Sequence, residues 1–173
     1  MIAIPTSAEA DVVPCPSLRL ADNEIHTYFY TTGFNSFRAV ADYAMDTLDS
    51  TTDMVSQLPE TPEFCEFRQT DVWWWSTNLA AGVRGQMSCA GWYTNGRCWS
   101  YDIDLDFTEL DQSSLDWEDR QKTACHELGH TLSISHNTTD GAGSCMISGE
   151  IPNANLQYRR YSSHHISHIA ALY

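Results

Sequence analysis

The stretch with the clearest chemical content is HELGHTLSISH, residues 126–136, which places three histidines and one glutamate within eleven residues. His126 and His130 are four residues apart, so on a helix both imidazoles leave the same face and can hold one ion at about 2.0–2.1 Å. Glu127 is rotated roughly 100° around the axis, where its carboxylate can reach a water on the ion without being a ligand. This spacing predicts a pair of metal ligands beside a general base.

His136 is the natural third ligand, because it follows His130 by six residues and faces the ion if the helix stops and the chain turns back. Three protein ligands and one open position are typical of catalytic zinc, whereas structural zinc sites are closed by four ligands. Zinc lowers the pKa of a bound water to about 7, so Glu127 is placed to take its proton. The spacing therefore favours a hydrolytic zinc site.

The same stretch resembles the signature of the metzincin zinc endopeptidases, HExxHxxGxxH followed by a methionine turn, and the matrixins in particular. Every ligand position matches, and Met146 stands ten residues after His136, where the methionine turn would form the floor below the metal. The resemblance implies a secreted zinc metalloendopeptidase in which the three histidines bind zinc. Glu127 would be the base and then the proton shuttle.

One position departs from the signature. The family has glycine at the eighth place, where the helix ends and φ is usually positive, but this chain has Ser133. A non-glycine residue in that conformation costs on the order of 1 kcal/mol or more. We therefore expect the turn that leads to His136 to be strained or differently shaped.

Two alternatives stay open from the sequence. Glu150 follows His130 by twenty residues, a ligand spacing seen in thermolysin-like enzymes, but Pro152 and Asn153 disfavour the helix that such a glutamate needs. The other alternative is a non-catalytic secreted binding module that keeps the fold and the zinc without turnover. The presence of Glu127 counts against this module, and the departure at Ser133 keeps it open.

Composition narrows the class of partner. The net charge is −14, with a single lysine and eight arginines against 23 acidic residues. Nucleic acids and anionic membranes attract basic surfaces, so neither is expected as a partner. No apolar run approaches the 18 residues of a membrane span. We expect a soluble monomer that acts on a protein or peptide substrate.

The cysteines indicate the compartment. The six are Cys15, Cys65, Cys89, Cys98, Cys125 and Cys145. They form no CxxC pair, so disulfides in an oxidising, extracellular compartment explain them better than a cysteine metal site. The opening residues lack the basic start and apolar stretch of a secretory signal, so we expect that a signal has been removed or left out if the protein is secreted.

Six cysteines allow 15 pairings. A bond between Cys125 and Cys145 would tie the zinc helix to the segment of the methionine turn. A bond between Cys89 and Cys98 meets a difficulty, because a regular hairpin around Asn95-Gly96 sets Cys98 opposite Tyr93 and leaves Cys89 four residues farther along its strand. At about 3.4 Å per residue this separation exceeds the roughly 7 Å limit for a bridge. Either the hairpin is irregular or the pairing is wrong.

The length predicts a single domain over residues 1–173, and the hydrophobic pattern predicts an α/β class. The expected parts are an extended N-terminal arm over 1–23, a strand over 24–31, a helix from 36 to about 49, strands over 64–68 and 71–76, a hairpin with arms 87–94 and 97–107, the zinc helix after 116, and a helix over 162–173. These parts form a twisted, mostly antiparallel or mixed sheet with a backing helix, the zinc helix and a C-terminal helix. The metzincin resemblance implies five strands, mostly parallel, with one antiparallel edge strand to which an extended substrate adds. It also implies that residues 141–161 wall the pocket for the side chain that follows the scissile bond.

A few other polar side chains invite a metal interpretation. Asp102, Asp104 and Asp106 alternate with apolar residues, so they share one strand face, which is either plainly solvated or bridged by calcium. Matrixin-like domains carry calcium near the equivalent strand. His164 and His168 lie one helical turn apart, and we interpret them as exposed helix histidines rather than as a second zinc pair.

Other single residues are interpreted structurally. His26 is far in sequence from the other histidines and is interpreted as a surface or core residue. Of the three consecutive tryptophans at 73–75, at least one ring should meet the core or a groove, because alternate strand residues face opposite sides. On the zinc helix, Trp117, Ala124 and Leu128 are expected along one packed side.

Overall fold

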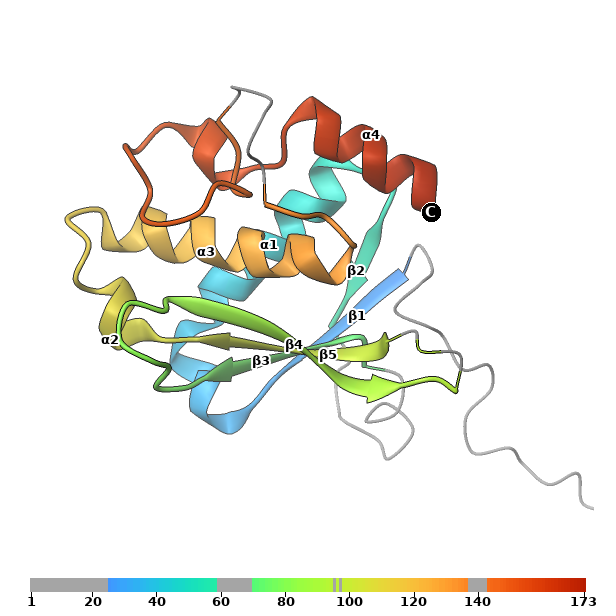
Figure 1. Ribbon diagram of the computed structural model, residues 1–173, viewed down its shortest axis with the longest axis horizontal. Coiled ribbons are helices and arrows are strands. Elements are labelled where there is room, and N and C mark those ends of the chain that lie inside the picture. Colours follow the sequence, from blue (N-terminus) through green and yellow to red (C-terminus); the bar gives the residue numbers. More distant parts are fainter. Residues whose placement is uncertain (1–24, 59–69, 95, 97, 137–142) are drawn as a thin grey trace, which may run out of the picture.

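The computed structural model describes residues 25–58, 70–94, 96, 98–136 and 143–173. Their elements are β1 (Ile25–Tyr30), η1 (Thr32–Phe37), α1 (Arg38–Thr51), β2 (Val55–Gln57), β3 (Val72–Ser76), β4 (Gly85–Trp92), β5 (Cys98–Leu105), α2 (Phe107–Leu110), α3 (Asp116–Thr131), η3 (Leu156–Arg159) and α4 (Ser163–Leu172). Figure 1 shows α3 lying across the sheet, with α1 behind it. The predicted α/β class is confirmed.

The described strands form one five-stranded sheet in the order β2-β1-β3-β5-β4. β1 pairs in parallel with β2 and with β3, and β3 pairs in parallel with β5. β4 is antiparallel to β5 and occupies the edge next to α3. The sheet is therefore mixed and mostly parallel with one antiparallel edge strand, which is the arrangement that the resemblance implied, and the mostly antiparallel option is wrong.

The core lies between the sheet and the helices. Alternate positions of the central strands are fully buried, among them Trp74 on β3 and Ile103 and Leu105 on β5. α1 contributes Val40, Ala44 and other residues at helical spacing, and α1 packs directly on α3. Burial of Trp74 confirms that one ring of the tryptophan triplet belongs to the core.

Several boundaries differ from the prediction. The helix predicted from residue 36 begins at Arg38, because residues 32–37 form the 3-10 turn η1 first. β2 was not predicted, since three residues are too few to show an alternating pattern. The predicted strand over 64–68 and the predicted arm over 1–23 lie outside the described residues.

α3 is buried along most of its length. Residues 121–129 are all buried, so the helix runs through the protein rather than along its surface. Acidic residues in its first turn suit the positive end of the helix dipole. Trp117 was placed on the packed side, but it is 42 % exposed, because the helix begins at the surface and enters the core only after its first turn.

The predicted C-terminal helix is confirmed as α4. Ser162 caps it, since its hydroxyl accepts the backbone N–H of His165 while the His165 side chain reaches back to the backbone of Ser162. Ile169 is buried beneath the helix. Within the described residues, no helix has the length and apolar character needed to cross a membrane.

Candidate metal centre

α3 brings the first two histidines together. His126 and His130 lie one turn apart, near the C-terminal end of the helix, and their ring centroids are 4.7 Å apart. His126 is buried and His130 is half-buried. The predicted helical pair is therefore present at the point where α3 passes under the edge strand.

A turn after α3 brings in the third histidine. The backbone N–H groups of Leu132 and Ile134 both bond to the carbonyl of Gly129, at 3.1 Å each, which closes the helix. Between them Ser133 has φ +62°, the one positive φ of a non-glycine residue in the described part of the chain. The strained turn predicted from the missing glycine is confirmed, and buried Leu132 and Ile134 anchor it on both sides.

Despite that turn, His136 meets the other two histidines. Its ring centroid lies 4.9 Å from those of His126 and His130. The ligand nitrogens of all three lie within 4.8 Å of one another, so this group could hold a metal ion. Among the residues that the structure describes, no other set of three histidines, cysteines or carboxylates comes this close.

Two of the rings are held in the orientation that a ligand needs. Nδ1 of His126 lies 2.8 Å from the carbonyl oxygen of Cys145, and Nδ1 of His130 lies 2.7 Å from that of Ile134. A carbonyl can only accept, so both Nδ1 atoms carry the proton and both Nε2 atoms keep a lone pair for a metal. Two imidazoles with this tautomer and a third beside them fit the zinc that the sequence predicts.

The protonation of the histidines also suits metal binding. Burial lowers the pKa of His126 to about 3, and Lys122 and the other two histidines push in the same direction. Burial also lowers the pKa of His130. Both side chains are therefore neutral at pH 7, which is the form that binds metal.

The Cys125–Cys145 disulfide fixes the partner of His126. The two Cα atoms are 5.8 Å apart, and the bond joins α3 to the segment that carries Met146, as suggested from the sequence. The carbonyl of Cys145 is the one that accepts from His126. The disulfide thus positions the carbonyl that orients this histidine.

Met146 packs directly beneath α3. It is fully buried, and a Cβ added to Gly129 would overlap its sulfur and come within 3.1 Å of the Tyr161 ring. A glycine inside a helix costs about 1 kcal/mol relative to alanine, and this close approach explains why α3 carries one. Gly129 lies between His126 and His130 in sequence, so Met146 supports the helix between them.

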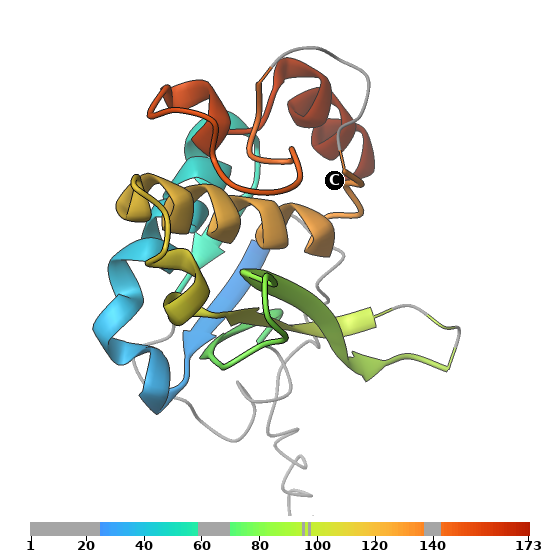
Figure 2. The ribbon, with the colours of Figure 1, turned by 60° about the vertical axis from the view of Figure 1, so that its left-hand side comes forward.

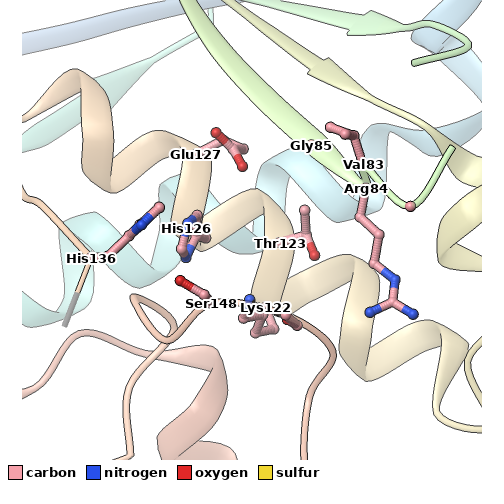
Figure 3. A pocket seen from close by; sticks show the side chains of 11 residues that line it. Val83, Arg84, Gly85, Lys122, Thr123, His126, Glu127, His136 and Ser148 are labelled. Atoms are coloured by element: carbon pink, nitrogen blue, oxygen red, sulfur yellow. Dashed lines mark hydrogen bonds between the residues drawn. The ribbon is translucent and has the colours of Figure 1, made fainter. Parts of the chain in front are cut away.

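Glu127 lies in a cavity of about 260 Å³ that also exposes His126 and His136 (Figure 3). Burial raises the pKa of Glu127 to about 7, although Lys122 and a hydrogen bond from the backbone N–H of Met87 act in the opposite direction. The edge strand lies close above this side chain. A Cβ on Gly85 would come within 2.9 Å of Cγ of Glu127.

Lys122 is a site residue that sequence reasoning missed. It is 3 % exposed, lines the same cavity and donates from Nζ to the carbonyl of Gly149 at 2.7 Å. Burial lowers its pKa to about 8, while Asp119 and Glu127 oppose the shift. Its position one turn before His126 was the available signal, because it places the only lysine on the face of the histidines.

Glu150 does not join the histidines. It accepts hydrogen bonds from the hydroxyl of Ser113 at 2.8 Å and from Arg84 at 3.1 Å, and it is exposed. The third histidine occupies the position next to His126 and His130 that this alternative needed. The thermolysin-like ligand set is therefore wrong.

Asp102 and Asp104 on β5 and Asp106, which follows the strand, form hydrogen bonds with different partners. Asp102 accepts from the indole of Trp75 at 2.8 Å, and Asp104 accepts from the hydroxyl of Thr77. Asp106 is 4 % exposed and caps α2, with one oxygen accepting two backbone N–H groups of that helix. The solvated-face interpretation is wrong for Asp106, and these bonds do not gather the three carboxylates around one calcium ion.

The remaining histidines stay apart from the candidate metal centre. His164 and His168 are exposed on α4, as predicted. His26 is fully buried in β1, where Nε2 lies 3.2 Å from the hydroxyl of Thr131 on α3. Of the two predicted locations, surface or core, His26 occupies the core.

The Cys89–Cys98 disulfide resolves the difficulty at the hairpin. Cys98 pairs with Trp92 in the ladder, yet the Cα atoms of Cys89 and Cys98 are 5.8 Å apart. The register shifts on both sides of Gly91, and this irregularity bends the strand so that the cysteines meet. The hairpin is irregular and the pairing is correct. All cysteines in the described residues are paired.

Comparison with known proteins identifies no relative of this chain. The chain matches no protein-family model, and no curated protein shows significant similarity to it. The function is therefore inferred from the geometry of the three histidines, Glu127 and the edge strand.

Proposed function

We propose that this protein is a secreted, zinc-dependent endopeptidase of the metzincin type. The observation that carries the proposal is the convergence of His126, His130 and His136 beside Glu127, whose carboxylate lies in the cavity that His126 and His136 also line. A structural zinc site would use four protein ligands. Three neutral imidazoles leave one position for water or substrate.

The three histidines would hold the zinc through nitrogens that are free to ligate. Zinc, when bound, lowers the pKa of water to about 7 and polarises a carbonyl oxygen. The hydrogen bonds of His126 and His130 to backbone carbonyls keep their rings oriented. The protein contribution is a rigid ligand set that costs little reorganisation during turnover.

Glu127 would move the proton. A pKa of about 7 makes its carboxylate a base and its carboxyl an acid near neutrality, which is the range that general acid–base catalysis requires. It can accept a proton from the attacking water at a carboxylate oxygen and donate that proton to the leaving amine. Burial excludes bulk water from this transfer.

The edge strand would hold the substrate. β4 pairs with β5 on one side only within the described sheet, and it runs past Glu127. An extended peptide can add to such an edge by backbone hydrogen bonds, which is a common mode of peptide recognition. Figure 2 shows the β4–β5 hairpin projecting beyond the rest of the sheet, so the strand offers length for such pairing. This arrangement favours an unfolded or extended polypeptide as substrate.

The disulfides support the assignment to an extracellular compartment. Cys89–Cys98 and Cys125–Cys145 both have Cα separations of 5.8 Å, within the usual range for a bridge. Such bonds persist in oxidising compartments and are rare in the cytosol.

A non-catalytic zinc-binding module is the alternative. The strain at Ser133 favours it, because a shifted turn can hold a metal in a geometry unsuited to turnover. The buried carboxylate of Glu127 next to the histidines favours the enzyme, since a binding module has no need for it.

Metal removal tests the proposal. A chelator should abolish hydrolysis of an unfolded protein, and one equivalent of zinc per chain should restore it. A chain that binds zinc but cleaves nothing in either state would contradict the enzyme and support the binding module.

A further inference from the structure

The cavity beside Glu127 contains an unusual concentration of basic side chains. The chain has nine lysine and arginine residues against 23 acidic ones, yet Lys122 and Arg84 both line this cavity. Figure 3 shows Arg84 at the end far from His136, with Thr123 and Lys122 between Arg84 and the histidines. We propose that this cavity selects an acidic substrate side chain, with Lys122 and Arg84 as the residues that determine the specificity. This inference rests on the proposed peptidase function.

Lys122 presents donors from the floor of the cavity. Its ammonium group has three N–H donors, and the bond to the carbonyl of Gly149 uses one of them. The side chain is 3 % exposed, so the group is desolvated and held in place by α3. A carboxylate that enters the cavity can bond to this ammonium without displacing the bond to Gly149.

The two acidic residues that pair with Arg84 do not line the cavity. Asp119 is fully buried, lies 3.3 Å from Nε of Arg84 and accepts the backbone N–H of Ile151. Glu150 accepts from Arg84 and from Ser113. Neither Asp119 nor Glu150 lines the cavity. These bonds hold the guanidinium in a fixed position, and its planar group still offers further donors to an incoming carboxylate.

The other described residues that line the cavity add little negative charge that could attract a cationic substrate side chain. Glu127 is the one carboxylate among them, and it is committed to the proton transfer in the proposed mechanism. The rest include Thr123, Ser148 and three glycines, which are neutral. A lysine or arginine side chain would therefore meet two like charges, whereas glutamate or aspartate would meet two opposite ones.

In the proposed peptidase, this cavity lies beside the metal ligands, where a substrate side chain would lie. Ser148 and Gly149 form part of its wall, and they belong to the segment expected to enclose the side chain that follows the scissile bond. Gly85, at the start of the edge strand, forms another part. The substrate residue that follows the scissile bond is therefore the one that we expect to be acidic.

The test uses peptides that differ only at the residue after the scissile bond, with glutamate, glutamine, leucine or lysine there. Zinc-loaded wild type should cleave the glutamate peptide with a kcat/KM about tenfold or more above that of the lysine peptide, because hydrogen bonds between charged groups are the strong ones. Lys122→Met should reduce the ratio of glutamate to glutamine rates by about tenfold. Lys122→Arg should keep the preference.

Arg120→Met is the matched control. Arg120 lies on the same helix and pairs with Asp111, but it does not line the cavity. Its removal should leave the ratio unchanged. Ratios within one variant cancel any common loss of folded enzyme. As a second measurement, the zinc-loaded Glu127→Ala protein should bind the glutamate peptide more tightly than the glutamine peptide, and adding Lys122→Met should reduce this difference.

The outcomes separate the two proposals. Cleavage by wild type with no preference for glutamate, or with a preference that Lys122→Met leaves intact, would overturn the acidic specificity and leave the peptidase standing. Failure of zinc-loaded wild type to cleave any peptide or unfolded protein would overturn the peptidase, and the specificity with it.

Discussion

The backbone of Gly85 lies directly against the side chain of Glu127. A Cβ at residue 85 would come within 2.9 Å of Cγ of Glu127 and within 2.7 Å of the methyl group of Thr123. The edge strand β4 and α3 therefore approach each other as closely as a glycine permits. This contact aligns the proposed base with the strand that would hold the substrate.

Gly85→Ala should impair catalysis more than zinc binding. The added methyl group must push Glu127 away or separate β4 from α3, and overpacking of this kind costs about 1–3 kcal/mol. We expect kcat/KM to fall by about tenfold or more, measured together with zinc content. Gly33→Ala is the control, because a Cβ there has nothing within 4 Å. Full activity in Gly85→Ala would show that this contact does not position Glu127.

Ser133→Gly should stabilise the protein. Ser133 adopts φ +62°, a conformation that costs a non-glycine residue about 1 kcal/mol. We expect the free energy of unfolding to rise by up to about 1 kcal/mol in urea titrations. Ser133→Val should lower it, because β-branched residues tolerate this region worst. The opposite order of the two variants would contradict the strained turn.

Loss of the Cys125–Cys145 disulfide should weaken zinc binding. The carbonyl of Cys145 orients His126, and loss of such supporting contacts typically costs 10–100-fold in metal affinity. We expect the double variant Cys125→Ala/Cys145→Ala to show a decrease of about this size in competition with a chromogenic chelator. Cys89→Ala/Cys98→Ala controls for general destabilisation, since this disulfide lies in the β4–β5 hairpin and its cysteines do not bond to His126. Equal losses in both would mean that the disulfide acts through stability alone.

His26 should make stability depend on pH in a defined window. Burial lowers its pKa to about 4 in the folded state, against 6.5 in the unfolded chain. Between these values the unfolded state binds more protons, so the stability conferred by neutral His26 is complete above pH 6.5 and declines as pH falls towards 4. The loss amounts to about 3 kcal/mol in all.

His26→Gln isolates this contribution. Glutamine can retain a hydrogen bond to Thr131 but does not titrate in this range. The difference in unfolding free energy between wild type and variant, measured from pH 7 to pH 4, should shift by roughly 3 kcal/mol in favour of the variant. A constant difference across that range would show that His26 is not a buried neutral histidine.

Much of the fold could be predicted because its signals are local. The helical spacing of residues 37–48 and the alternation in residues 101–107 each depend on neighbouring positions. The spacing of the three histidines likewise predicted which residues would meet. β2 was not predicted because three residues are too few to show an alternating hydrophobic pattern. The burial of Asp106 was not predicted because its partners are backbone amides of the helix that follows.

Other features depend on contacts distant in sequence. The meeting of Cys89 and Cys98 requires a register shift at Gly91 that no spacing rule supplies. The close approach of Gly85 to Glu127 arises from packing of the edge strand on α3. The role of Lys122 depends on a carbonyl 27 residues away. Such contacts appear only once the elements are assembled.

The most direct test of the proposed peptidase compares wild type with Glu127→Ala on an unfolded protein substrate, with bound zinc quantified in both. We predict one zinc per chain in each protein, cleavage by wild type, and a loss of about 100-fold or more in the variant, in keeping with the size of general acid–base effects. Equal cleavage by both proteins, or zinc binding without cleavage by either, would contradict a mechanism in which Glu127 transfers the proton.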